Sequence, residues 1–133
     1  MIRMAVSGTV RSALLALLLG LALSVAGEAG ARQPATTGVT IALADLPSQG
    51  RATYRLILAG GPFVYDKDGS VFGNRERQLP AARRGYYREY TVKTPGARSR
   101  AGRRIICGGR RPTQPEACYY TSDHYASFRK IIE

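Results

Sequence analysis

Histidine and cysteine are scarce in this sequence of 133 residues. His124 is the only histidine, and Cys107 and Cys118 are the only cysteines. Their spacing fits no common zinc motif, because structural and catalytic zinc sites need three or four such ligands. Two aspartates in the segment Asp66-Lys67-Asp68-Gly69-Ser70 resemble the start of a calcium loop, but the remaining ligand positions are missing. We therefore expect no metal ion and no cofactor.

Lysine and the acidic residues are also scarce, whereas arginine is abundant. Lys and Arg together number 20, of which only three are lysines, against 9 Asp and Glu, and the formal net charge is +11. Arginine has a planar fork that suits phosphates and stacks on bases, while lysine acts mainly as a point charge. The composition therefore favours a polyanionic partner, with nucleic acid ahead of a membrane surface. Charge that serves solubility or adhesion to a cell wall is the alternative.

The one long apolar run lies near the N-terminus. The run Ala13 to Ala26 follows two arginines and precedes Ala29-Gly30-Ala31, a small-x-small pattern typical of signal-peptidase sites. This pattern predicts a secretory signal peptide over residues 1–31, with an uncleaved anchor as the alternative, although the run is short for a membrane span. Residues 32–133 suffice for one domain but not two. A secreted, extracellular protein is expected.

Export makes a disulfide between Cys107 and Cys118 the default expectation. Ten residues separate the two cysteines, and they include Gly108-Gly109 and two prolines. The spacing predicts two strands joined by a long hairpin loop, with the disulfide near the mouth of that loop and a structural role for it. Arg110 and Arg111 lie inside the loop, and the sequence assigns them no role.

The pattern of elements predicts an α+β fold. Leu46-Pro47-Ser48 opens a helical stretch with apolar residues at Ala52, Leu56 and Ala59, and Gly60-Gly61-Pro62 ends it. Short strand candidates stand before and after this helix. They cover residues 39–43, 86–92, 105–106, 118–121 and 127–132. We expect one N-terminal helix packed on a four- or five-stranded antiparallel sheet.

The segment from Gly85 to Ile106 combines one carboxylate with several guanidinium groups. Glu89 lies inside the predicted strand at residues 86–92, and a Thr94-Pro95-Gly96 turn follows. Four arginines come next, at positions 98, 100, 103 and 104. An acid that faces guanidinium groups across a hairpin is suited to hold a phosphate beside a general base. A solvated basic hairpin without chemistry is the alternative.

A second segment, Phe72-Gly73-Asn74-Arg75-Glu76, combines an aromatic ring, a flexible backbone and an isolated carboxylate. Such a segment can stack on a base and read its edge. Guanine alone presents adjacent N1–H and N2–H₂ donors that one carboxylate accepts together. The alternative is a loop in which Glu76 forms a salt bridge with a nearby arginine.

These segments together carry a family resemblance. The sequence from about Val39 to Ile132 resembles the small secreted guanyl-specific ribonucleases of bacteria. The motifs that carry the resemblance are FGNRE at 72–76, GYYREYTV at 85–92, TPGARSR at 94–100, RRII at 103–106 and DHYA at 123–126. The resemblance implies an endoribonuclease that cleaves single-stranded RNA 3′ of guanosine through a 2′,3′-cyclic phosphate and then yields a 3′-phosphate.

The resemblance also implies catalytic roles. Glu89 matches the general base that takes the proton from the ribose 2′-OH, and His124 matches the general acid that protonates the departing 5′-oxygen. Arg100 and Arg104 match the two arginines that hold the phosphate. Tyr125 resembles a tyrosine that contacts the phosphate. These roles agree with the chemistry of the residues, since arginines stabilise charge that develops in a transition state and histidine exchanges a proton near neutral pH.

Five further residues match the guanine-binding segment of the family. Phe72 and Glu76 match the stacking and edge-reading residues, while the backbones of Gly73, Asn74 and Arg75 match its N–H donors. Gly73 stands where a larger polar residue is usual, and we expect little loss of specificity because the backbone makes the contact.

Two expectations about partners follow. By resemblance, the producing cell should contain an acidic cytoplasmic inhibitor of the barstar kind, and the enzyme should be a monomer.

The alternative function is a secreted basic protein that binds RNA or anionic surfaces without catalysis. Replacement of Glu89 or His124 separates the two, because only an enzyme would lose turnover while it keeps salt-dependent RNA binding.

Overall fold

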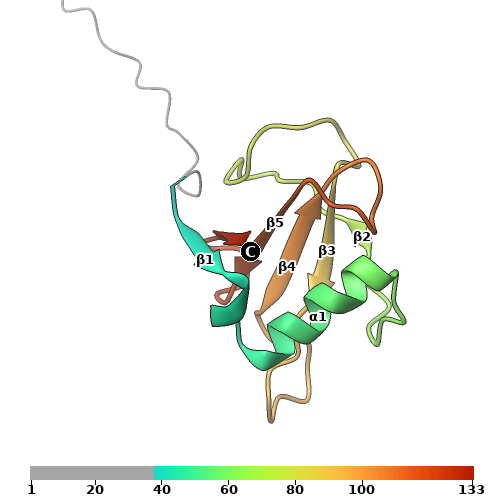
Figure 1. The fold of residues 1–133 in the computed structure, drawn as a ribbon, viewed down its shortest axis with the longest axis vertical. Helices are drawn as coiled ribbons and strands as arrows, with labels where there is room; N and C mark the ends of the chain where they lie inside the picture. Colours follow the sequence, from blue (N-terminus) through green and yellow to red (C-terminus); the bar gives the residue numbers. More distant parts are fainter. Residues whose placement is uncertain (1–37) are drawn as a thin grey trace, which may run out of the picture. The chain divides into compact units, whose positions relative to one another are not determined.

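The computed structural model describes residues 38–133, in which one helix lies against one face of a sheet (Figure 1). The predicted signal peptide at residues 1–31 lies outside the described residues. A single turn of 3₁₀ helix, Leu43–Asp45, precedes the α-helix. The elements follow the order β1 Thr40–Ala42, α1 Ser48–Ala59, β2 Ser70–Val71, β3 Tyr87–Thr91, β4 Arg104–Gly108, β5 Ala117–Thr121 and β6 Arg129–Ile132. No helix within residues 38–133 is long and apolar enough to cross a membrane.

The sheet has six strands in the order β1-β6-β5-β4-β3-β2. Neighbouring strands are antiparallel except for β1 and β6, which pair in parallel with Ile41 opposite Ile131. The α+β class is confirmed, but the predicted four- or five-stranded antiparallel sheet is wrong in strand number and in the direction of one pair. The C-terminal strand β6 returns beside β1 after the chain has built the rest of the sheet, and β2 has only two residues, too few to show a strand pattern.

Helix α1 begins and ends where the sequence predicts. It starts directly after Pro47, and its C-terminus is closed by Gly60 in the left-handed conformation, with φ 81°. The N–H groups of Gly60 and Gly61 donate to the carbonyls of Ile57 and Leu56, at 3.2 and 2.9 Å. Glycine adopts this backbone conformation without strain, which explains the sharp end of the helix.

The face that α1 buries differs from the predicted apolar stripe of Ala52, Leu56 and Ala59. The buried residues of the helix are Gly50, Thr53 and Ile57, whereas Ala52 and Ala59 are exposed. Thr53 is buried because its hydroxyl donates to the carbonyl of Thr91 in β3 at 3.1 Å, which satisfies the polar group. The predicted stripe took only apolar residues into account. It is therefore wrong by one position, because Thr53 and Ile57 are buried in place of Ala52 and Leu56.

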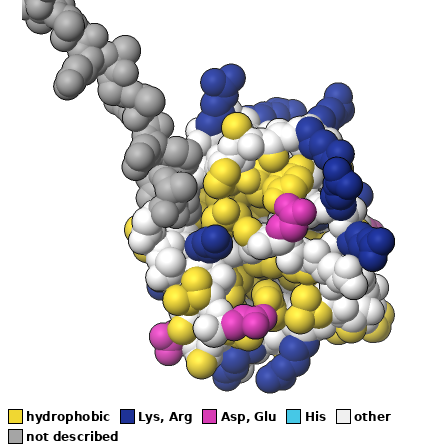
Figure 2. Space-filling model, turned by 45° about the horizontal axis from the view of Figure 1, so that its top comes forward, with side chains coloured by type: hydrophobic (Ala, Val, Ile, Leu, Met, Phe, Trp, Pro, Cys, Tyr) yellow, Lys and Arg dark blue, Asp and Glu magenta, His cyan; other side chains and the backbone are white. Residues whose placement is uncertain are grey.

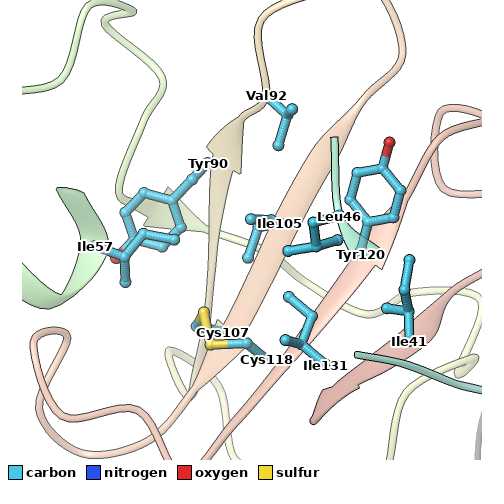
Figure 3. Close-up of a cluster of buried hydrophobic side chains, with 10 residues drawn as sticks. All are labelled: Ile41, Leu46, Ile57, Tyr90, Val92, Ile105, Cys107, Cys118, Tyr120 and Ile131. Atoms are coloured by element: carbon cyan, nitrogen blue, oxygen red, sulfur yellow. A yellow bond between two sulfur atoms is a disulfide. The ribbon is translucent and has the colours of Figure 1, made fainter. Parts of the chain in front are cut away.

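The sheet has an apolar core on each face, because successive side chains of a strand point to opposite faces. On the helix face, Ile57 packs with residues of the central strands that include Tyr90, Ile105 and Tyr120 (Figure 3). On the opposite face, the cluster consists of Leu79, Tyr87, Ile106, Tyr119 and Phe128. The second face also carries Glu89 and Arg104. Glu89 lies two positions after Tyr87 on β3, and Arg104 lies two positions before Ile106 on β4.

The predicted disulfide is confirmed. Cys107 and Cys118 are bonded, and they stand directly opposite each other on β4 and β5, at the mouth of the loop that joins these strands. Both cysteines are buried in the helix-face cluster, away from the face that carries Glu89. The bond is therefore placed for a structural role.

Removal of this disulfide should destabilise the fold without changing the chemistry. The double variant Cys107→Ala/Cys118→Ala should lose roughly 2 to 3 kcal/mol of unfolding free energy, because the bond restricts the unfolded chain around a short loop. Urea denaturation measures this loss. At a temperature where the variant remains folded, its kcat for RNA cleavage should equal that of the unmodified protein. A loss well below 1 kcal/mol would contradict the structural assignment.

Candidate active site

A pocket of about 340 Å³ opens on the sheet face opposite α1, and all six predicted substrate-binding residues line it. They are Phe72, Gly73, Asn74, Arg75, Glu76 and Tyr125. The predicted base Glu89 lines the same pocket, so the two segments that the sequence singles out meet at one place. Val71, Gln78 and Phe128, which the sequence analysis did not select, complete the wall.

In the described part of the chain, four residues of the segment after β2 have backbone N–H groups without an acceptor, and all four residues line this pocket. The N–H groups of Gly73, Asn74, Arg75 and Glu76 donate to no other described residue. Unpaired backbone donors are uncommon unless water or a ligand accepts from them. Consecutive N–H groups of this kind form a concave site for a carbonyl oxygen or an anion.

Asn74 fixes the shape of this segment. Its backbone is in the left-handed region with φ 48°, which Asn tolerates better than most residues. Its side chain accepts from the N–H of Leu79 at 3.1 Å and donates to the carbonyl of the same residue at 2.9 Å. Leu79 is buried, so the clamp anchors the loop to the core. The sequence predicts a role only for the backbone of Asn74, and the structure adds this side-chain function.

Aromatic rings close one side of the pocket. The rings of Phe72 and Tyr125 stack with centroids 5.4 Å apart, and Phe128 meets Phe72 edge-on at 6.1 Å.

Glu76 is exposed, and its carboxylate accepts from the amide of Gln78 at 3.3 Å. The amide of Gln78 also donates to the carbonyl of Tyr125 at 3.0 Å and so connects the two walls. Glu76 makes no salt bridge with any described arginine, contrary to the alternative interpretation of this loop.

Glu89 is held by two donors, one at each carboxylate oxygen. Arg100 Nη2 donates to Oε1 at 3.1 Å, and the hydroxyl of Tyr125 donates to Oε2 at 3.1 Å. The side chain of Glu89 is 14% exposed, and that of Arg100 is 26% exposed. The carboxylate is thus oriented by its partners but still open to the pocket. This is the geometry that a general base needs, since it must reach a substrate proton.

Arg104 is buried to 2% exposure without a carboxylate partner. Its Nε donates to the hydroxyl of Tyr125 at 3.2 Å, and its Nη1 donates to the carbonyls of Arg103 and Arg100 at 2.8 and 3.3 Å. Among the described residues, nothing accepts from its Nη2. A buried guanidinium that lacks a counter-ion is costly, and a bound phosphate would supply the missing charge.

The hydroxyl of Tyr125 connects Arg104 and Glu89, because it accepts from one and donates to the other. Burial, followed by the negative charge of Glu89, raises the pKa of Tyr125 above its usual value. The hydroxyl therefore keeps its proton throughout the neutral range and remains a donor.

His124 precedes Tyr125 in a tight turn after β5. Its ring is exposed and lies 4.8 Å from the ring of Tyr125, centroid to centroid. Both residues have left-handed backbones, with φ 56° and 71°, and the N–H of His124 donates to the carbonyl of Gly102 at 3.0 Å. A β-carbon on Gly102 would lie 3.2 Å from the backbone nitrogen of His124, so the glycine permits this close approach.

Asp123 holds this turn together, a role that the sequence analysis missed. Its carboxylate accepts from the hydroxyl and the N–H of Ser127, at 2.5 and 2.9 Å, and from the hydroxyl of Thr121 at 2.8 Å. The hydrogen bonds from Ser127 lower the pKa of Asp123 below its ordinary value. The bond from the N–H of Ser127 is of the side chain to backbone kind by which Asp usually fixes a turn.

Asp123→Asn should therefore destabilise the turn in a pH-dependent manner. Because the pKa of Asp123 is lower in the folded protein, its charge stabilises the fold above the unfolded pKa, and this stabilisation is lost as the pH falls through the folded pKa. The variant should lose a few tenths to about 1 kcal/mol at pH 7, since the carboxylate is largely exposed. Urea unfolding at pH 7 and at about pH 2.5 measures this loss. An equal difference between the two proteins at both pH values would contradict the assignment.

Thr91 is a further residue that the sequence analysis missed. Its hydroxyl accepts from Arg100 Nε at 3.0 Å, so Thr91 and Glu89 together orient one guanidinium. The signal was present in the sequence, because Thr91 follows Glu89 by two positions on a strand and must share its face.

The described residues contain no cluster of histidine, cysteine or acidic side chains that would hold a metal ion.

Comparisons with known proteins give this arrangement a family. A ribonuclease family profile matches residues 30–132. Guanyl-specific ribonuclease Sa of Kitasatospora aureofaciens is 53% identical over 92 residues, which cover 69% of this chain and 92% of that protein. The chain belongs to the microbial ribonuclease family.

Further relatives are ribonucleases as well. Guanyl-specific ribonuclease Sa3 of the same organism is 57% identical over 86 residues, and the match spans 65% of this chain but only 58% of Sa3. Among solved structures, ribonuclease Sa2 in complexes with mononucleotides matches with a TM-score of 0.68 at 42% identity, over 76% of this chain and 98% of that one. Ribonuclease Sa2 with guanosine-2′-cyclophosphate matches with a TM-score of 0.64, also at 42% identity, over 71% and 95%.

The predicted membership in the guanyl-specific ribonucleases is thus confirmed, and so is the expectation of an enzyme. The roles of single residues remain predictions. The structure brings Glu89, Arg100, Arg104 and Tyr125 into one hydrogen-bonded group at the edge of the pocket. His124 adjoins that group through the ring of Tyr125.

Proposed function

We propose that this ribonuclease is a secreted endoribonuclease that binds guanosine in the pocket and cleaves the phosphodiester on its 3′ side. One observation carries the proposal: residues 72–76, which we call the base-reading segment, line the same pocket as Glu89 and Tyr125. A guanosine in this pocket would have its ribose and its 3′-phosphate beside Glu89, because the base occupies the other end.

Three features of the pocket complement guanine. The carboxylate of Glu76 can accept from both N1–H and N2–H₂, which no other base offers together. The unpaired N–H groups of residues 73–76 can donate to the O6 carbonyl. The rings of Phe72 and Tyr125 offer apolar faces for stacking, which stabilises a base by about 1 to 3 kcal/mol.

The first chemical step is a transesterification. Glu89 takes the proton of the ribose 2′-OH, and the 2′-oxygen forms a bond to phosphorus. The bond from phosphorus to the 5′-oxygen of the next nucleotide breaks, and His124 gives that oxygen its proton. The guanosine product carries a 2′,3′-cyclic phosphate. Arg100 and Arg104 stabilise the charge that builds up on the phosphate oxygens, as preorganised cations do in many enzymes.

The second step is a hydrolysis in which the two residues exchange roles. His124, now neutral, takes a proton from water, the water oxygen attacks phosphorus, and the bond to the 2′-oxygen breaks. Glu89, now protonated, returns the proton to that oxygen, and a 3′-phosphate results. The dependence of kcat/KM on pH should be bell-shaped, because one group must start deprotonated and the other protonated.

Product analysis of one defined substrate tests this function. A single-stranded RNA with a single internal guanosine, incubated with the protein in EDTA, should give fragments that end in guanosine 2′,3′-cyclic phosphate and later in guanosine 3′-phosphate. In water enriched in heavy oxygen, mass spectrometry should find the label only in the second product. A 5′-phosphate product would contradict the proposed chemistry, and binding without cleavage would favour the alternative of a non-catalytic RNA-binding protein.

Secretion and the protein inhibitor are further parts of the proposal. A disulfide suits an oxidising compartment outside the cytoplasm, and the N-terminal sequence predicts export. A monomer is expected, and an acidic inhibitor of the barstar kind would protect the producing cell by neutralising the basic site. Mass measurement of the exported protein would place the cleavage site, and co-purification from the cytoplasm would reveal the inhibitor.

A further inference from the structure

The pocket proposed to bind guanine, lined by Glu76 and Glu89, is called the guanine pocket below. A second depression adjoins it on the other side of the base-reading segment. It has a volume of about 650 Å³, and residues 71–75 form one wall, which it shares with the guanine pocket. Residues 82–85 and Tyr87 form the other wall. We call this depression the arginine groove, because Arg75, Arg83 and Arg84 line it.

The charge of the arginine groove has one sign. None of its lining residues is acidic, and the three arginines are exposed. Their side chains form no ion pair or hydrogen bond with any described residue. Lys and Arg side chains also outnumber acidic ones on the face of the molecule shown in Figure 2. Unpaired guanidinium groups along a depression are complementary to the phosphates of a nucleic acid.

The backbone fixes the position of two of these arginines. The N–H of Tyr86 donates to the carbonyl of Arg83 at 3.1 Å and closes a four-residue turn. Gly85 occupies the third position of this turn with φ 85°, a conformation that glycine adopts readily. Arg83 and Arg84 therefore belong to a closed turn within the connection between β2 and β3.

The location of the groove sets the direction of an RNA chain. Glu89 and Tyr125 line the guanine pocket but not the arginine groove. Under the proposed function, the 3′-phosphate of the bound guanosine lies beside Glu89, so the chain on its 3′ side leaves from that end. The chain on the 5′ side needs another exit, and the arginine groove adjoins the opposite side of the base-reading segment.

We propose that the arginine groove binds the phosphate and the nucleotide on the 5′ side of the recognised guanosine, an inference that rests on the proposed function. This interaction takes place away from the reacting bond, so it is equally strong in the ground state and in the transition state. Such uniform binding lowers KM and leaves kcat unchanged.

Three substrates with the same scissile bond test the proposal. GpA has no neighbour on either side, UpGpA adds one nucleotide on the 5′ side, and GpApU adds one on the 3′ side. For the unmodified protein, kcat/KM should be about tenfold higher for UpGpA than for GpA, because two exposed charged groups contribute roughly two- to fivefold each. In Arg83→Ser/Arg84→Ser this advantage should vanish through KM, while GpA is cleaved as before.

The salt dependence gives a second readout. For UpGpA, the slope of log kcat/KM against log salt concentration should become shallower in the variant, by about 0.7 for each phosphate that the protein no longer neutralises. The matched control is Arg55→Ser/Lys67→Ser, which removes the same charge from exposed positions that line neither depression. This control should keep the full advantage of UpGpA.

Four outcomes would count against the groove. The first is that the unmodified protein has the same kcat/KM for UpGpA and GpA. The second is that Arg83→Ser/Arg84→Ser lowers kcat/KM equally for both substrates, and the third is that the control variant loses as much of the UpGpA advantage as this variant does. The fourth is that Arg83→Ser/Arg84→Ser lowers kcat/KM for GpApU alone. If the unmodified protein cleaves none of the three substrates, the proposed function fails as well. Cleavage of GpA without a gain from the 5′ nucleotide overturns the groove proposal alone.

Discussion

Glu89→Gln and His124→Gln should each lower kcat for cleavage of GpA by about 10² to 10⁴, the usual contribution of a positioned general base or acid. Glutamine keeps the shape of the Glu89 side chain, but its amide accepts from only one of the two donors, Arg100 and Tyr125, and it cannot take a proton from the 2′-OH. Single-turnover assays and the pH dependence of kcat/KM measure the effect. The side of the bell-shaped profile that belongs to the replaced residue should disappear.

The controls for this prediction separate catalysis from folding and from RNA binding. The ring of His124 is exposed, so its replacement should leave the unfolding free energy nearly unchanged. Both variants should keep salt-dependent binding to RNA, because the arginines remain. Glu116→Gln, the same chemical change at an exposed carboxylate outside the guanine pocket, should retain full activity. Full cleavage activity in both Glu89→Gln and His124→Gln would show that the catalytic assignment is wrong.

Glu76→Gln should remove most of the discrimination between guanine and adenine. A carboxylate accepts two hydrogen bonds from guanine, and glutamine would oppose one of these donors with its own N–H₂ group. Two charge-assisted hydrogen bonds contribute about 3 to 6 kcal/mol together, so kcat/KM for GpA should fall by about 10² to 10⁴. Steady-state kinetics on GpA and ApA measure the ratio.

The same experiment distinguishes recognition from catalysis. Turnover of ApA should stay within a few-fold of the unmodified protein, because Glu76 does not belong to the hydrogen-bonded group around Glu89. Gln78→Ala should have a smaller effect on GpA, since Gln78 acts on the base reader through one hydrogen bond to Glu76. A uniform loss on GpA and ApA in Glu76→Gln would contradict its role in base reading.

Local signals in the sequence were sufficient for the parts of the fold that short-range interactions determine. Glycine at position 60 and the Thr94-Pro95-Gly96 turn mark ends that depend on a few neighbouring residues, and the structure places them accordingly. The disulfide pairs the only two cysteines, and they face each other across neighbouring strands. The predicted proximity of Glu89 and an arginine was confirmed as the ion pair with Arg100.

The parts that the sequence did not reveal depend on long-range packing. The parallel pairing of β1 with β6 joins the two ends of the domain, and no local pattern encodes the direction of that pair. Thr53 is buried only because a carbonyl of β3 accepts from it, which a count of apolar residues cannot detect. The role of Asp123 likewise depends on Ser127 and Thr121, which surround it once the turn has formed.

A metal-independent ribonuclease that reads guanine in the pocket beside Glu89 should cleave a guanosine dinucleotide far faster than the others. The most direct test is cleavage of the four dinucleotides GpA, ApA, CpA and UpA by the purified protein with EDTA present. Rapid turnover of GpA, with kcat/KM at least about 10²-fold above the other three, is the predicted result. Comparable cleavage of all four would contradict the base reading by Glu76, and no cleavage by a folded, disulfide-bonded sample would contradict the proposed function.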